Sequence, residues 1–586
     1  MSLRIPGLAS GMDTDMMVES MMKAERLKVS RYEQSKQVSL WRQEAYNSMN
    51  KMFANFILNT KKDLGLNKTT STGLVLGSSY NNLDYIRKAV SSNENVATVR
   101  AGKDAVNGSY SIKVDKLANG ASFTSADMKD KETFEDDTKF SITTTINGKD
   151  VVKEIEIKKG ESMSDVAKKI SSAKVTIDDK EVDLGVTAFY DKDNGRLFMQ
   201  TTATGLGTKI ELKEVDEGSS KDFVEALNGV GLDANDPKRG HKTEGTDAQI
   251  EYNGIKLNYS SNNINFNGIN IELKATSTDS ITMKVDTNVD GIFDKITKLI
   301  DDYNELVDKA GGAIGEKRYS NYQPLSQDEK KAMHEDDVKL WTEKAKSGML
   351  NRDENLTRIL QNIRTDLYKT LDNPDGSFNH ITQIGISTEK YAKGSVGGKL
   401  QIDEQKLREA IMEDPEGVME LLFKEASSLP DKPSIRTKPV QEEGVSDEEF
   451  AKDMDKYKEE LEAYNKELRE YEKANKKHLK ENNGIFTNIY DNLIDGMKSI
   501  IDKSGTGEEA DLFRNVKSNM LIDFVTTKSS ISDLDKEVLE MNKRIDNLNI
   551  LLARKEQSYY AKFANMEKML AQMNSQSSWI GQQLMR

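Results

Sequence analysis

Few residues of the types that carry out chemistry lie close together in this sequence. The chain has no Cys, which excludes disulfide bonds and thiolate metal sites. No two of its four His residues lie near one another, so none has the spacing of a zinc ligand pair. They are His241, His334, His380 and His478. We therefore expect no catalytic site, no metal site and no cofactor.

One stretch has the opening spacing of a calcium loop. Asp286, Asn288 and Asp290 alternate along the chain and are followed by Gly291. Such a loop needs a bidentate carboxylate at its twelfth position, where this chain has Thr297. A polar junction between a strand and a helix, with Asp290 as the helix N-cap, explains the same residues. The sequence therefore favours a junction over a calcium site.

The composition indicates several domains with much surface per unit of core. At roughly 150 residues per domain, 586 residues correspond to about four domains. Only 36% of the residues are hydrophobic, which suits an elongated molecule or one whose cores are completed in an assembly. The formal net charge of −14 argues against a nucleic-acid partner.

The sequence carries no visible export or membrane signal. Its start lacks the apolar core of a secretory signal peptide. No run of about 18 apolar residues exists, so we expect no membrane insertion. The residues alone therefore predict a cytosolic protein, or one exported by a route that cleaves no signal peptide.

Both ends of the chain have the apolar spacing of amphipathic helices. Near the N-terminus a stripe with spacings of 3 and 4 runs over residues 38–56, and Asp13 can cap a helix upstream of it. Near the C-terminus a longer stripe runs from residue 531 to 573, which is a coiled-coil length. A helix with such a stripe needs a partner, either the N-terminal helix or a neighbouring copy. An ordinary helical core is the alternative.

The middle of the chain has the pattern of antiparallel β-structure. Residues 110–115 alternate between apolar and polar, as in a half-buried strand. Hairpins are predicted at Asn147-Gly148, at Asn253-Gly254 and at Asn267-Gly268, because these pairs tolerate positive φ. Helical spacing returns at residue 291. The fold class expected is multidomain α+β, with terminal α-helical coiled-coil legs, an α-helical domain and inserted antiparallel β domains.

A charged helix is predicted within this second helical part. From residue 450 to 471 a largely aromatic stripe alternates by 4 and 3, and the positions between are nearly all charged. We expect the helix at 485–501 to cover that stripe.

Several separate motifs follow one another in a specific order. The first is Gly7-Leu8-Ala9-Ser10-Gly11-Met12-Asp13-Thr14, and others lie at residues 42–46, 108–114, 559–568 and 573–579. Together they resemble the flagellar hook-associated protein 2 family, the filament cap proteins. The stretch at 341–350 resembles Gram-positive members of that family.

The resemblance implies a structural protein, not an enzyme. Members form a ring at the filament tip, which retains exported flagellin and promotes its folding and insertion. The implied partners are other copies of the chain, flagellin, the hook–filament junction proteins and an export chaperone at the C-terminal helix. The implied location is extracellular, at the flagellum tip. An adhesin that binds host glycan or mucin, and a hook–filament junction protein, are the alternatives.

The resemblance and the stripes together predict residues for self-assembly or filament contact. They are Leu8, Met12, Met16, Met21, Val38, Trp41, Met541, Ile545, Leu548, Tyr559, Phe563, Met566, Met573 and Trp579.

Four domains are expected. Residues 1–40 with 540–586 form the leg, and 41–72 with 291–539 the helical domain, with a charged insertion at about 445–482. Residues 73–118 with 243–290 form one β domain, and 119–242 the second.

Overall fold

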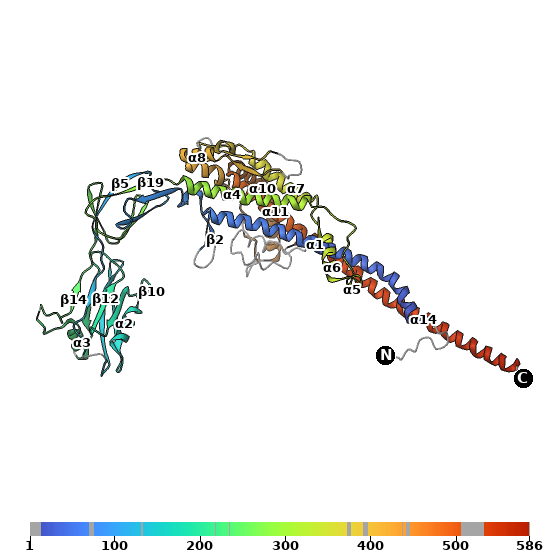
Figure 1. Ribbon diagram of the computed structural model, residues 1–586, viewed down its shortest axis with the longest axis horizontal. Coiled ribbons are helices and arrows are strands. Elements are labelled where there is room, and N and C mark those ends of the chain that lie inside the picture. Colours follow the sequence, from blue (N-terminus) through green and yellow to red (C-terminus); the bar gives the residue numbers. More distant parts are fainter. Residues whose placement is uncertain are drawn as a thin grey trace. The chain divides into compact units, whose positions relative to one another are not determined.

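The chain divides into two compact units. Met1–Leu83 and Ile292–Arg586 belong to the helical unit, and Asp84–Gly291 to the β unit. The computed structural model describes residues 13–69, 75–129, 133–216, 218–233, 235–371, 377–390, 397–435, 437–440, 446–505 and 532–584. Figure 1 shows the elements of both units, coloured along the chain.

The helical unit is built mainly from α-helices. The helices are α1 (Thr14–Asp63), α4 (Val289–Gly315), α5 (Gln327–Ala332), α6 (Glu335–Lys346), α7 (Glu354–Leu367), α8 (Glu404–Glu413), α9 (Pro415–Phe423), α10 (Asp447–Asn482), α11 (Ile485–Ser504) and α14 (Asp533–Leu584). Between them lie β1 (Asn67–Thr69) paired with β2 (Val75–Gly77), β20 (Ile386–Thr388) paired with β21 (Leu400–Ile402), and the 3-10 turns η1 (Tyr80–Asn82) and η3 (Ile381–Ile384).

Helix α1 is a single helix of 50 residues with a defined start and end. The Asp13 carboxylate accepts a hydrogen bond from the Met16 backbone N–H at 2.9 Å, so the predicted N-terminal cap is confirmed. At the other end the Leu64 N–H donates to the Thr60 carbonyl at 3.0 Å. Gly65 follows with a φ of 72°, a conformation that stops a helix and favours glycine.

The core of the helical unit is aromatic and joins α1, α4 and α11. The ring of Phe56 on α1 lies 5.9 Å from the ring of Tyr490 on α11. The Tyr303 ring on α4 meets the Phe486 ring on α11 edge-on at 6.0 Å. The Tyr490 hydroxyl is paired with the Thr60 hydroxyl at 2.9 Å, which satisfies both polar atoms inside the core. One core therefore ties together helices that are far apart in sequence.

A buried polar network fixes α1 to α7 and α11. The hydroxyl of the fully buried Tyr46 donates to an Asp353 carboxylate oxygen. The Lys503 ammonium lies 3.2 Å from the same oxygen, and the other oxygen accepts the Leu356 N–H at the start of α7. Burial alone would raise the pKa of Asp353, but these donors and the Lys503 charge outweigh burial and hold the pKa below its usual value.

Helix α10 is held to the rest of the helical unit at its C-terminal end. The buried Asp366 carboxylate on α7 lies 3.2 Å from the Lys480 ammonium. Further along, the Tyr471 hydroxyl donates to the Leu429 carbonyl at 2.6 Å, and the Leu429 N–H donates to Asn475 at 2.7 Å. No residue of α10 is buried. The expectation that α11 covers the α10 stripe is therefore wrong, because the coil before α10 supplies the stripe's contact at Tyr471.

The β unit consists of antiparallel sheets arranged around two hydrophobic clusters. One cluster is formed by a five-stranded sheet of order β16-β15-β5-β19-β3 and a three-stranded sheet of order β17-β18-β4. The other is formed by sheets of order β11-β12-β6-β14 and β13-β7-β8, the hairpin β9-β10, and helices α2 and α3. The elements are β3 (Arg87–Ser91), β4 (Ala97–Ala101), β5 (Gly108–Lys116), β6 (Ser122–Thr124), β7 (Thr138–Ile146), β8 (Lys149–Ile157), α2 (Met163–Ser171), β9 (Lys174–Ile177), β10 (Lys180–Asp183), β11 (Val186–Asp191), β12 (Arg196–Thr201), β13 (Ile210–Glu214), α3 (Ser219–Asn228), β14 (His241–Thr243), β15 (Ala248–Tyr252), β16 (Ile255–Tyr259), β17 (Asn263–Phe266), β18 (Ile269–Leu273) and β19 (Ile281–Thr287).

The three predicted Asn-Gly hairpins are confirmed. Asn147, Asn253 and Asn267 have φ angles of 51°, 47° and 48°, and the glycine after each is also at positive φ. This is the backbone of a two-residue hairpin turn, whose twist matches that of the flanking strands. Strands β7 and β8, β15 and β16, and β17 and β18 pair across these turns. The fold class is therefore multidomain α+β, with long terminal helices and antiparallel sheets, as expected.

Replacing Asp353 by Asn tests the buried network. The native carboxylate has a lowered pKa, so its stabilising effect is present above the unfolded value of about 3.9 and is lost as the pH falls through the folded value. We expect Asp353→Asn to lower the free energy of unfolding at pH 7 by about 2 kcal/mol and to weaken the dependence of stability on pH below 5. Urea unfolding followed by circular dichroism measures both. Asp336→Asn, at an exposed site on α6, is the control, and equal effects of the two changes would contradict this role.

Removing the outer part of α10 tests whether that part supports the fold. Leu429 and Tyr471 touch, so residues 430–470 can be replaced by a short Gly-Ser linker while Lys480 stays in place. We expect the thermal midpoint of the helical unit to stay within about 3 °C of its original value. Leu422→Asp, at a buried site on α9, should unfold the unit and serves as the positive control. A comparable loss on removing 430–470 would show that this part belongs to the core.

Candidate assembly surface of the terminal helices

The first and last long helices of the chain pair in an antiparallel coiled coil. Figure 1 shows α14 running beside α1. Three polar contacts set the register. Glu25 meets Lys555 at 2.6 Å, Arg544 donates to the Tyr32 hydroxyl at 3.4 Å, and Gln43 donates to Asp535 at 2.9 Å. As the residue number falls along α1 it rises along α14, so the helices run in opposite directions.

The Glu25–Lys555 pair is the closest ionic contact between the two helices among the described residues. The hydrogen bond between them lowers the pKa of Glu25 and raises the pKa of Lys555. Both side chains remain partly exposed, so the pair fixes register and adds little stability. The aliphatic residues around it supply the burial.

The C-terminal stripe lies on the face of α14 that meets α1. Ile545 is buried, and the other predicted residues up to 566 are half-buried: Met541, Leu548, Tyr559, Phe563 and Met566. From α1 the buried apolar partners are Val18, Met22 and Val29. The sequence therefore identified the correct face of α14. Its role in self-assembly stays a prediction.

The predicted residues near the N-terminus do not form one surface. Met16 and Met21 are exposed, and Val38 and Trp41 are half-buried. The Trp41 ring lies under the Lys346 ammonium at 5.7 Å, so this side of α1 faces the end of α6. Leu8 and Met12 lie outside the described residues.

Sequence reasoning missed the face of α1 that is actually buried. Along that face every residue follows a 4-3 spacing, and polar side chains occupy about half of the positions. The face consists of Val18, Met22, Glu25, Val29, Tyr32, Lys36, Ser39, Gln43, Tyr46, Asn50, Phe53, Ile57 and Thr60, all buried or half-buried. The stripe at 38–56 has more apolar residues but is less buried, apart from Phe56. An unbroken 4-3 spacing that admits polar residues would have revealed the correct face.

Pairing of two helices leaves apolar side chains of both exposed. Met21 is 43% exposed and Met573 63%, and Trp579 is 61% exposed near the end of α14. Among the described side chains, the exposed large apolar residues of the pair are Met16, Met17, Met21, Leu27, Leu539, Ile550, Leu551, Met569, Met573, Trp579 and Ile580. Eleven such side chains on one pair of helices make the pair a candidate for a protein–protein contact.

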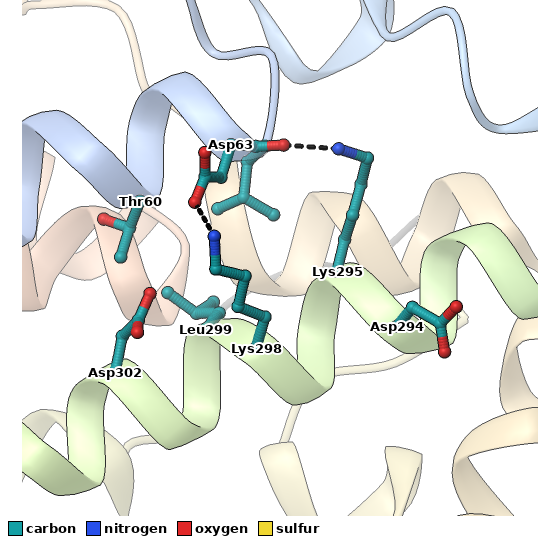
Figure 2. Close-up of a pocket in the computed structure, with 8 residues that line it drawn as sticks. Thr60, Asp63, Asp294, Lys295, Lys298, Leu299 and Asp302 are labelled. Atoms are coloured by element: carbon teal, nitrogen blue, oxygen red, sulfur yellow. Dashed lines mark hydrogen bonds and ion pairs between the residues drawn. The ribbon is translucent and has the colours of Figure 1, made fainter.

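A half-open hollow lies where α1 ends against α4. It has a volume of about 270 Å³. Figure 2 shows Lys298 reaching the Asp63 carboxylate and Lys295 reaching the Asp63 backbone carbonyl. Two ammonium groups at a helix C-terminus stabilise its unpaired carbonyls and complement its dipole. The hollow is therefore a joint between helices, and its two ammonium groups are engaged in that joint.

The calcium-like motif forms the predicted strand-to-helix junction, but the cap is a different residue. The side chain of Asn288 accepts the Gly291 N–H at 3.2 Å and donates to the Tyr85 carbonyl at 3.0 Å. Helix α4 begins at Val289, so Asn288 is the N-cap and the expectation of Asp290 is wrong. An amide can both accept from the helix and donate to a neighbouring carbonyl, which a carboxylate cannot do.

No candidate metal or membrane site emerges from the described ranges. Within them no three His, Asp or Glu side chains are grouped so that they could hold a metal ion. Within the same ranges, no helix combines the length and hydrophobicity needed to cross a bilayer.

Comparison with known families gives three matches along this chain. Residues 10–121 match the N-terminal model of flagellar hook-associated protein 2, and residues 245–575 match its C-terminal model. The chain belongs to this family. Residues 144–203 also match the flagellin hook IN motif.

Two relatives by sequence agree with this assignment. Flagellar hook-associated protein 2 of Halalkalibacterium halodurans is 26% identical over 98% of both chains. The B-type flagellar hook-associated protein 2 of Pseudomonas aeruginosa is 25% identical, over 57% of this chain and 65% of the relative. The solved D1-D2-D3 domains of the flagellar cap protein FliD from Escherichia coli are 21% identical, over 65% of this chain and 90% of that one, with a TM-score of 0.45.

Two neighbouring methionines separate the roles of the two faces of α1. Met22 is 1% exposed and lies in the face toward α14, whereas Met21 is 43% exposed. We expect Met22→Ala to lower the free energy of unfolding of the helical unit by about 2–5 kcal/mol, because it leaves a cavity. Met21→Ala should change it by about 0.5 kcal/mol or less. Chemical unfolding of both variants measures the difference, and equal effects would contradict the assignment of faces.

Proposed function

We propose that this protein caps the flagellar filament as a ring of identical subunits. Membership of the hook-associated protein 2 family supports the cap assignment. The observation that carries the proposal is the exposed apolar surface on the paired terminal helices, which a solitary chain leaves in contact with water. Other copies and the filament end would cover it, and this burial would drive assembly.

The cap acts on flagellin without catalysing a reaction. Subunits at the filament tip retain exported flagellin and give it an enclosed place to fold and insert. This work needs a surface that can bind flagellin and release it again. Exposed methionines on the paired helices suit it, because their flexible side chains adapt to different partners. Flagellin and other copies of this chain are the principal partners.

Further partners and the location follow from the same proposal. The hook–filament junction proteins would be further partners. An export chaperone would bind the C-terminal helix before secretion. The protein would act outside the cell, at the flagellum tip.

The four-part division is also part of this proposal. Residues 1–40 with 540–586 would be the leg that contacts the filament, and 41–72 with 291–539 the helical domain. Residues 73–118 with 243–290, and 119–242, would be the two β domains. The two hydrophobic clusters of the β unit support a division between its parts.

Negative charges placed at two exposed positions of α1 test the function. Met16→Glu combined with Met21→Glu keeps the face toward α14 intact and should leave the fold unchanged. In a strain that lacks its own cap protein, we expect wild-type protein to restore motility and this double variant to release flagellin monomers into the medium. Flagellin in the culture supernatant is the measurement.

Lys23→Glu is the matched control, because Lys23 is exposed on the same helix and the net charge changes by the same amount. We expect the control to cap filaments normally. Normal capping by the double methionine variant would contradict the proposal.

A further inference from the structure

Eight Asn-Gly pairs occur in this chain, and such a pair can undergo a reaction within itself. The glycine backbone nitrogen can attack the amide carbon of the asparagine side chain, because glycine has no Cβ to obstruct the approach. The eight pairs begin at Asn107, Asn119, Asn147, Asn194, Asn228, Asn253, Asn267 and Asn483. All of them lie within the described residues. The structure therefore separates the pairs that are held in place from those that are not.

Five of the eight pairs are held by the asparagine side chain. The Asn253 side-chain oxygen accepts the Ser111 N–H at 3.1 Å, and the Asn194 amide donates to the Asp191 carboxylate at 2.6 Å. The amides of Asn107, Asn228 and Asn483 donate to Thr287, Val224 and Asp491 respectively. Each of these side chains must break a hydrogen bond before its amide carbon can turn toward the glycine nitrogen.

Two further pairs are held by the glycine. A Cβ added at Gly120 would lie 2.8 Å from the Ala203 carbonyl oxygen, and one added at Gly268 would lie 2.4 Å from the Ala105 backbone nitrogen. The Gly268 carbonyl also accepts the Gly102 N–H at 2.7 Å. Backbone atoms this close oppose the rotation that would bring the glycine nitrogen to the asparagine side chain.

The remaining pair, Asn147 and Gly148, forms the tip of the hairpin between β7 and β8. Both residues are exposed. Within the described ranges the Asn147 side chain has no hydrogen-bond partner, and a Cβ added at Gly148 would meet nothing within 4 Å. The strands pair up to Ile146 and Lys149, directly beside the turn. The two turn residues can therefore rotate without moving the strands.

We infer that Asn147 is a site of spontaneous deamidation, with water as the only other reactant. The Gly148 nitrogen loses its proton to solvent and bonds to Cγ of Asn147. The bond between Cγ and the side-chain nitrogen breaks, and that nitrogen takes up a proton and leaves as ammonia. Water then opens the resulting succinimide ring at either carbonyl, which gives aspartate or isoaspartate.

The product changes the hairpin tip and leaves the base of the hairpin in place. Aspartate adds a negative charge at an exposed position, and isoaspartate also adds one carbon atom to the backbone of the turn. Below the tip, the Asp150 carboxylate lies 2.6 Å from the Lys209 ammonium and accepts the Thr145 hydroxyl at 3.1 Å. These contacts fix the strands, so the modification marks the chain without unfolding the β unit. The inference does not depend on the proposed ring.

Incubation of the full-length folded chain in mildly alkaline buffer tests the inference. We expect Asn147 to deamidate at least about tenfold faster than Asn253 and Asn267, because those two sites must first open locally. Peptide mapping by mass spectrometry measures each site over time, since replacing an amide by a carboxyl group changes the mass of the peptide. Asn147→Gln should remove the modification at this position and leave the rates at the other sites unchanged.

The same chain unfolded in guanidinium chloride is the matched control. There the pairs differ only in their neighbouring residues, so we expect the rates at Asn147, Asn253 and Asn267 to agree within about threefold. Equal rates at the three sites in the folded chain, or a slower rate at Asn147, would overturn the inference. A tenfold difference that persists in the unfolded chain would overturn it as well, because local sequence and not the fold would then be the cause.

Discussion

The antiparallel pairing of α1 and α14 is the constraint on which the rest of the helical unit depends. This contact brings the first and last helices of the chain together. The β unit, Asp84–Gly291, is therefore inserted between two parts of the helical unit. The network around Tyr46 and Asp353 anchors α1 next to that contact. A pair of helices, however, buries only one face of each helix, so apolar residues remain on the other faces. That incomplete burial is the physical basis for expecting assembly.

Much of the fold could be predicted from the sequence where the signals were local. The Asn-Gly turns specify both positive φ angles of a hairpin, so three hairpins were placed correctly. The long 4-3 stripe of α14 is apolar at nearly every position, so its buried face was also identified. These predictions succeeded because a few neighbouring residues determine the outcome.

The predictions that failed depended on contacts across the chain. On α1 a second stripe, at 38–56, is more apolar than the buried face over the same residues, and hydrophobicity alone selects the wrong face. Gln43 belongs to the buried face because it donates a hydrogen bond to Asp535 on α14, a contact that a single sequence does not reveal. Likewise Asn288 replaces Asp290 as a cap because the Tyr85 carbonyl lies beside it. The α10 stripe has an ideal spacing for a helix partner, yet an adjacent coil contacts it.

The central claim is that apolar surface left open in a single chain becomes buried on assembly. Amide hydrogen exchange of residues 569–584 tests it most directly, when measured in the free protein and in protein bound at filament tips. The account predicts that exchange in this segment slows by about tenfold or more on assembly, while exchange in the core of α11 stays the same. Equal exchange of the segment in both states would contradict the account.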